Sequence, residues 1–349
     1  MTTARSAGRF ALTLAIAAVG GFLMWLVHMP LAWLLGAMLA TALCTFLHVP
    51  VSLPRHARPP MTAVIGAMLG TSFSPQVFSH AGAWIVSLLG LVVFIALTGW
   101  LAFTYFRRIA GLDPVTAYFS AMPGGLVEMI TLGSEKGGDE RMIALIHAAR
   151  IFLVVLTLPF LIETFTGLDI DRSGVVSAGT AAVSMDDAAW FLGAAAGGAV
   201  LGVLLRLPAR FLLGPMLVSA TLHLAGVTDF ELPAAALAAA QVVIGATIGC
   251  RFAGASPRMV LRAMVLSAGA TVLMLLSTLL FSSLLSLAGG DRFIAYVLAY
   301  SPGGVAEMSL IALFLDVEVP FVVVHHLVRV LTVVAGAAAV FRLMRVRET

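Results

Sequence analysis

The stretch 122–129 reads Met-Pro-Gly-Gly-Leu-Val-Glu-Met, and a related stretch at 301–308 reads Ser-Pro-Gly-Gly-Val-Ala-Glu-Met. The second copy lies 179 residues after the first (301 − 122 = 179), and each copy interrupts an apolar segment. Proline removes a backbone hydrogen-bond donor and glycine favours non-helical backbone, so each Pro-Gly-Gly predicts a break in a helix. Each copy also places a carboxylate, Glu128 or Glu307, three residues after its second glycine.

A histidine and an arginine follow each copy at the same offset. His147 and Arg150 are matched 179 residues later by His326 and Arg329. Residues three apart on a helix share a face, so each histidine should lie beside its arginine. Ionisable side chains are expensive at membrane depth, so the duplicated set of glutamate, histidine and arginine marks a candidate functional site.

The composition predicts a membrane protein. The chain has 349 residues, of which 61% are hydrophobic and 11% are charged, and its mean hydropathy is +1.06. Soluble domains carry roughly a quarter charged residues, so a soluble fold is excluded. The net charge of +3 is small and the basic residues lie in loops, which indicates membrane orientation rather than nucleic-acid binding.

The correspondence between the two halves extends beyond these motifs, with offsets that drift by single residues. A repeat at this scale predicts a tandem duplication. We expect a first membrane repeat over 10–165, an acidic linker over 166–187 and a second membrane repeat over 188–345. The further matched stretches are 20–21 with 197–198, 34–39 with 212–217, and 64–67 with 243–246.

Apolar segments in the first half predict about five spans and one interrupted segment at 113–136. The first two spans form a hairpin, which recurs in the second half at 188–205 and 208–226. The expected spans of the first half are 10–28, 30–48, 61–78, 81–106 and 140–165.

Basic residues occupy complementary loops in the two halves. Arg55 and Arg58 follow the first hairpin, whereas Arg206 and Arg210 lie in the turn of the second. Because basic residues favour the cytoplasmic side, this pattern predicts two halves of opposite orientation. Two halves have opposite orientation only if each half crosses the membrane an odd number of times. The five predicted spans give an odd number if each Pro-Gly-Gly segment enters and leaves the membrane on the same side. The predicted fold is an all-α polytopic membrane protein of two inverted-topology repeats, each with about five transmembrane helices and one re-entrant or broken Pro-Gly-Gly segment, and with both termini cytoplasmic.

Interrupted segments at matching positions of two inverted repeats indicate a transport site. Backbone groups freed by a helix break cannot face lipid, so they line a cavity or are buried in protein. The N-termini of half-helices attract anions. The alternative is that Pro-Gly-Gly only makes a tight turn. The candidate substrate-binding residues are Pro123, Gly124, Gly125, Arg150, Pro302, Gly303, Gly304 and Arg329.

The glutamates admit two interpretations. In the first, Arg150 and Arg329 bind an anionic substrate, while Glu128 and Glu307, together with the two duplicated histidines, bind or relay a coupling cation. In the second, each glutamate forms a buried ion pair with an arginine and stabilises the protein. Both can hold at once, so both stay open.

Other ionisable residues give weaker evidence of a functional site. His325 has no counterpart, because position 146 is isoleucine, so we expect it to be less central. Cys44 and Cys250 lie far apart in apolar runs and indicate neither a disulfide framework nor a metal site. No metal and no cofactor are predicted.

The segments 121–129 and 300–308, followed by His-x-x-Arg at 147–150 and 326–329, resemble the AbrB membrane-duplication family over essentially the whole chain. This resemblance implies a multi-pass protein of the bacterial inner membrane. Members are named either AbrB-type regulators of gene expression or ammonia monooxygenases. The layout is also similar to that of sodium/glutamate symporters and 2-hydroxycarboxylate transporters, which is a likeness of fold alone.

The residues weigh against two of these functions. A monooxygenase needs a redox metal held by clustered ligands, and the duplicated set offers one glutamate, one histidine and one arginine per half. A DNA-binding regulator needs a soluble basic module, whereas the longest non-membrane stretch, 166–187, is short and acidic. We therefore expect neither an enzyme nor a direct nucleic-acid partner.

The expected function is secondary transport of a small anionic solute coupled to protons or sodium. The expected partners are the lipid bilayer, the solute and the coupling ion, with a homodimer as one option for assembly. The alternative is an inner-membrane sensor or regulatory protein that acts indirectly on gene expression.

Overall fold

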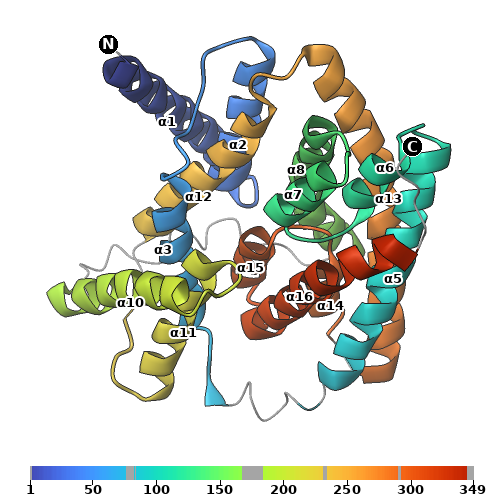
Figure 1. The fold of residues 1–349 in the computed structure, drawn as a ribbon. Coiled ribbons are helices and arrows are strands. Elements are labelled where there is room, and N and C mark those ends of the chain that lie inside the picture. The colour runs from blue at the N-terminus through green and yellow to red at the C-terminus, as the bar shows by residue number, and fades with distance from the viewer. Residues whose placement is uncertain are drawn as a thin grey trace. The chain divides into compact units, whose positions relative to one another are not determined.

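The computed structural model describes residues 2–75, 82, 84–166, 184–230, 234–289 and 292–343 (Figure 1). Within these ranges the longer regular elements are α-helices. Those before residue 167 are α1 Thr2–Leu26, α2 Ala32–Phe46, α3 Arg58–Gly70, α5 Trp84–Arg108, α6 Pro114–Ala121, α7 Leu126–Glu135 and α8 Glu140–Thr166. Those after residue 183 are α10 Met185–Leu204, α11 Arg210–Leu224, α12 Ala234–Gly249, α13 Pro257–Gly289, α14 Phe293–Tyr300, α15 Val305–Phe314 and α16 Val319–Leu343.

The helices support a membrane-spanning protein. Seven helices in the described part of the chain are long and apolar enough to cross a membrane. The second helix of each predicted hairpin is shorter than expected, because α2 and α11 each contain 15 residues. The predicted span 61–78 is also shorter, since α3 ends at Gly70 and residues 76–78 lie outside the described part.

Each Pro-Gly-Gly segment separates two short helices. The first break lies between α6 and α7 and the second lies between α14 and α15. Asp113 fixes the start of α6, because its side chain accepts hydrogen bonds from the backbone N–H groups of Val115 and Thr116 at 3.0 and 2.9 Å. Pro114 suits this first turn, where its missing N–H costs nothing. The predicted helix breaks are therefore present at both copies of the motif.

The described helices fall into two compact units that combine segments from both halves of the sequence. The first unit contains Met1–Ser79, Leu158–Gly254 and Ser309–Pro320. The second contains His80–Thr157, Ala255–Met308 and Phe321–Thr349. These units are defined by contacts, whereas the predicted repeats over 10–165 and 188–345 are defined by sequence similarity. The repeats therefore stay a prediction. Most of the predicted linker, residues 167–183, lies outside the described residues.

Small residues set the close helix contacts of the first unit, in which α3 packs on α11 and α12 packs on α2 (Figure 1). A side chain at Gly66 would collide with the carbonyl oxygen of Leu212, and one at Gly245 would collide with that of Leu34. The Gly-x-x-x-Gly patterns at 66–70 and 245–249 thus mark close helix contacts. In both cases the partner helix comes from the other half of the sequence.

The second unit contains both Pro-Gly-Gly segments and the duplicated ionisable residues. The two long helices of this unit, α5 and α13, contact each other. Helix α5 also contacts α6, and α13 also contacts α14. Tyr300 at the end of α14 packs edge-on against Phe94 of α5, with ring centroids 5.1 Å apart. This buried core holds the short helices in place, and therefore positions the ends that flank each break.

Candidate functional site

Arg150 on α8 and Arg329 on α16 make equivalent contacts at the two helix breaks. Arg150 Nη1 donates to the carbonyl oxygen of Met122 at 3.3 Å, and Arg329 Nη1 donates to that of Ser301 at 2.5 Å. Each carbonyl belongs to the residue just before the proline, at the C-cap of α6 or α14. A cation at a helix C-terminus satisfies free carbonyl groups and complements the helix dipole. The arginines therefore stabilise the ends that Pro-Gly-Gly exposes.

The duplicated histidines bind the last turns of the same short helices. His147 Nε2 lies 2.8 Å from the carbonyl oxygen of Phe119, and His326 Nε2 lies 3.0 Å from that of Leu298. A ring nitrogen that faces a carbonyl oxygen acts as the donor, so in both rings Nε2 carries a proton. Both histidines are fully buried. Each Pro-Gly-Gly segment is thus held by one histidine and one arginine from the helix that follows it.

The two halves differ in the second contact of the arginine. Arg150 Nη2 lies 2.9 Å from His147 Nδ1. Arg329 Nη2 instead donates to the carbonyl oxygen of Gly303 at 2.6 Å, and His326 Nδ1 is buried without a hydrogen-bond partner. The same four-residue motif therefore adopts two hydrogen-bond arrangements in one structure.

Both arginines keep a free donor although they are buried. Arg150 is 4% exposed and Arg329 is 3% exposed, and the Nε atom of each has no hydrogen-bond partner. Leaving a buried donor unpaired costs about 1–3 kcal/mol, and more for a charged group. The positive charges of the two side chains also repel each other. An anion that accepts hydrogen bonds from these Nε donors would offset both costs, so the two arginines are the strongest candidates for ligand binding.

The glutamates lie over the starts of their own helices. Gly125 is the N-cap of α7, and Glu128 is the third residue of that helix. A Cβ built on Gly125 would collide with Oε2 of Glu128, and one on Gly304 would collide with Oε2 of Glu307. A glutamate at this position caps the free N–H groups and complements the positive end of the dipole. The hydrogen bonds of the arginines run to carbonyl groups and a histidine, and the glutamate–arginine ion pairs stay a prediction.

The two glutamates lie in different environments. Glu307 is 2% exposed, whereas Glu128 is exposed. Together with the different arginine contacts, this shows that the two copies of one motif are not conformationally equivalent.

His325 has hydrogen-bond partners at both ring nitrogens, although the absence of a counterpart in the first half led us to expect a less central residue. Its Nδ1 lies 2.8 Å from the carbonyl oxygen of Phe321, and its Nε2 lies 2.9 Å from Oγ of Ser87 on α5. The hydroxyl of Tyr300 donates to the backbone carbonyl of the same Ser87. The sequence signal for this network is a histidine inside an apolar run, because Ser87 lies more than 200 residues away from both His325 and Tyr300.

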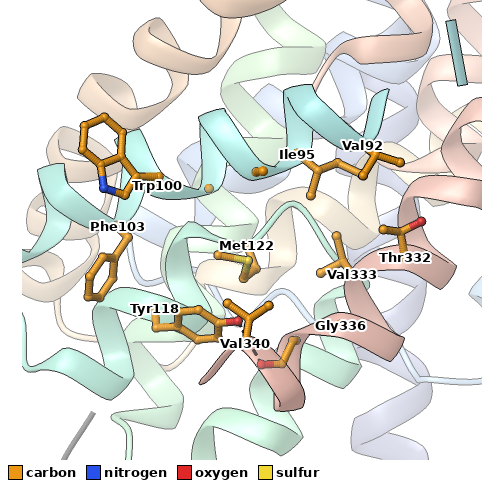
Figure 2. A pocket seen from close by; sticks show the side chains of 13 residues that line it. Val92, Ile95, Trp100, Phe103, Tyr118, Met122, Thr332, Val333, Gly336 and Val340 are labelled. Atoms are coloured by element: carbon orange, nitrogen blue, oxygen red, sulfur yellow. Dashed lines mark hydrogen bonds between the residues drawn. The ribbon is translucent and has the colours of Figure 1, made fainter. Parts of the chain in front are cut away.

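An apolar cavity of about 280 Å³ lies beside the first Pro-Gly-Gly segment, between α5, α6 and α16 (Figure 2). Its walls include Val92, Trp100, Tyr118, Val333 and Gly336. The Met122 side chain also lines it, next to the carbonyl group that Arg150 binds. The sequence offers no signal for this cavity, because its walls come from helices at opposite ends of the chain.

Helix α16 also backs the first break directly. A Cβ on Gly124 would lie 2.8 Å from a methyl carbon of Val333, and the Tyr118 hydroxyl donates to the carbonyl oxygen of Ala337 at 2.9 Å.

Across the ranges that the structure describes, no group of three or more His, Cys, Asp or Glu side chains could hold a metal ion.

Comparison with known proteins agrees with the motifs. The family model described as "Transition state regulatory protein AbrB" matches residues 33–345. The Bacillus subtilis (strain 168) protein named "Uncharacterized protein YhjN" is 30% identical over 95% of this chain and 92% of its own length. The Escherichia coli (strain K12) protein named "Putative regulator AbrB" is 28% identical over 90% of each chain. The chain therefore belongs to the AbrB family.

Proposed function

We propose that this protein is a secondary transporter of a small anionic solute. The observation that carries the proposal is the pair of buried arginines, each bound to a helix break and each with an unpaired Nε donor. Half-helix breaks within a membrane protein are a recurrent setting for substrate sites. We place the protein in the inner membrane as two inverted halves with both termini in the cytoplasm, following the distribution of basic loops.

The solute's anionic group would bind the arginine Nε donors. Two guanidinium groups offer charge and directional donors in a setting with little water, where such hydrogen bonds are strong. The backbone at the two Pro-Gly-Gly segments would add the positive ends of α7 and α15.

The glutamates would couple solute binding to a cation. Glu128 and Glu307 each already place a negative charge at the positive end of a helix. A second anion nearby is disfavoured until that charge is neutralised by a proton or by sodium. Binding of the cation would therefore favour binding of the solute, and the two would cross the membrane together.

The unequal halves support alternating access. In an inverted repeat, the two membrane-facing states arise when each half takes the conformation of the other. Arg150 contacts a histidine while Arg329 contacts a glycine carbonyl, and Glu128 is exposed while Glu307 is buried. Exchange of these arrangements would interconvert the two states.

The test is solute uptake by purified protein in liposomes, across a panel of small organic anions and amino acids. We expect uptake that is driven by an imposed proton or sodium gradient and abolished in Arg329→Gln. In Glu307→Gln we expect binding without gradient-driven accumulation. Variants count only if they elute as the same species as the parent protein in size-exclusion chromatography. Absence of uptake for every anion under every imposed gradient would overturn the proposal.

A membrane sensor is the second candidate, because the name of the Escherichia coli relative says that it is a regulator. The same liposomes separate the two functions. A sensor would bind an anion with an affinity that depends on Arg150 and Arg329 but would show no flux under any gradient.

A further inference from the structure

We infer that the transported anion carries an apolar group about the size of an aromatic ring, which occupies the cavity between α5, α6 and α16. This inference rests on the proposed function and narrows its substrate to aromatic carboxylates. It is carried by the chemistry of the cavity walls, by the position of Met122 and by a glycine that packing does not require.

Met122 connects the cavity to the arginine site. Its backbone carbonyl accepts a hydrogen bond from Arg150, while its side chain lines the cavity (Figure 2). One residue, Met122, therefore separates the Arg150 guanidinium group from the cavity. The methionine side chain is flexible and polarisable, so it can adapt to a ring placed against it.

The cavity walls suit an apolar group and not a second charge. The lining side chains are mostly hydrocarbon or aromatic. The hydroxyl of Tyr118 donates to the carbonyl group of Ala337, and the other polar groups of the lining are the Thr332 hydroxyl and the Trp100 indole N–H. A polar group buried here without a partner would lose its hydration without compensation. Dicarboxylates and sugar acids are therefore poor candidates. An enclosed apolar cavity of about 150 Å³ binds benzene. The present cavity is open on one side, where Val92, Trp100 and Val340 are exposed, and its volume of about 280 Å³ has room for a ring with a short chain.

The space next to Gly336 of α16 is empty at the point where a side chain would begin. This residue lies within α16, where glycine costs about 1 kcal/mol of helix stability relative to alanine. Close packing does not require it, because an added Cβ would meet no atom within 4 Å. Gly99 across the cavity differs, since its Cβ would lie 3.0 Å from the Met122 side chain. A side chain at 336 would therefore start in open space at the cavity wall.

The test measures binding to the purified full-length protein by titration calorimetry, with 3-phenylpropanoate and propanoate as probes. Gly336→Leu fills the cavity, and Gly197→Leu is the matched control, because that exposed helical glycine also has no atom within 4 Å of an added Cβ. We expect the parent protein to bind 3-phenylpropanoate about tenfold more tightly than propanoate, or better. Gly336→Leu should reduce the affinity for 3-phenylpropanoate to about that for propanoate, while Gly197→Leu should keep the preference of the parent protein.

Three results would overturn the inference. Equal affinity for both probes, with loss of both in Arg329→Gln, would leave the anion transporter in place but without an aromatic substrate. Loss of co-purified lipid in Gly336→Leu, seen by native mass spectrometry with carboxylate binding unchanged, would assign the cavity to an acyl chain. Binding of neither probe, in a protein that transports other anions, would exclude aromatic carboxylates. If no anion binds or moves at all, the proposed function fails together with this inference.

Discussion

His147 and Arg150 share a hydrogen bond of 2.9 Å between Nδ1 and Nη2. Arginine can only donate, so His147 Nδ1 is an acceptor, while Nε2 donates to the carbonyl group of Phe119. The ring is therefore held in its neutral form, and a second proton would face the donor of a guanidinium group. This geometry favours a positioning role for His147, so the proposed coupling would depend on the glutamates.

Replacing His147 by leucine should destabilise the protein by about 2 kcal/mol or more, because one buried donor and one buried acceptor lose their partners. His326→Leu should cost less, since His326 has a hydrogen bond only through Nε2. Thermal unfolding in detergent measures both variants. Equal losses would contradict the unequal hydrogen bonding of the two halves.

Arg150→Lys and Arg329→Lys should each weaken anion binding by roughly tenfold. Lysine keeps the charge, but it lacks the fork of donors that can hold a carbonyl group and an anion at once. The dissociation constant of a bound carboxylate measures the effect. Arg258→Lys, at an exposed position near the start of α13, is the control and should change nothing. Full affinity in both site variants would mean that charge alone binds the anion.

Glu128→Gln and Glu307→Gln should uncouple transport from the gradient while costing less than about 1 kcal/mol of stability. Glutamine can still cap the start of a helix, but it carries no charge to neutralise. Flux under imposed gradients and thermal unfolding are measured on the same preparations. A large loss of stability with normal coupling would show that the carboxylates are structural only.

Gly304→Ala should destabilise the protein more than Gly125→Ala. In both cases a methyl group would collide with the glutamate carboxylate, but exposed Glu128 can move away whereas buried Glu307 cannot. Adding Glu307→Ala to Gly304→Ala should recover part of the loss, which a double-mutant cycle measures. No recovery would indicate that the glycine is needed for another reason.

The helix breaks could be predicted because they depend on local chemistry. Proline and glycine end a helix wherever they occur, and both breaks lie at the Pro-Gly-Gly motifs. The membrane class and the small-residue helix contacts were also predictable, since composition and four-residue spacing carry that information. His147 and Arg150 were correctly placed on one face of a helix by their spacing.

The partners of the charged groups could not be predicted. The structure joins the arginines to carbonyl groups and places Glu128 over its own helix start, and neither contact follows from the spacing of these residues. Which oxygen lies nearest a buried guanidinium depends on how separate helices pack, and several candidates were available in the sequence.

The sequence by itself determined the membrane class, the two helix breaks and the duplicated set of ionisable residues, because each follows from local composition or from a fixed offset. Only the tertiary structure decided the unequal hydrogen bonding of Arg150 and Arg329, the environment of His325 and the cavity beside Met122. These features arise between helices distant in sequence, and packing determines which groups become neighbours and which space stays empty.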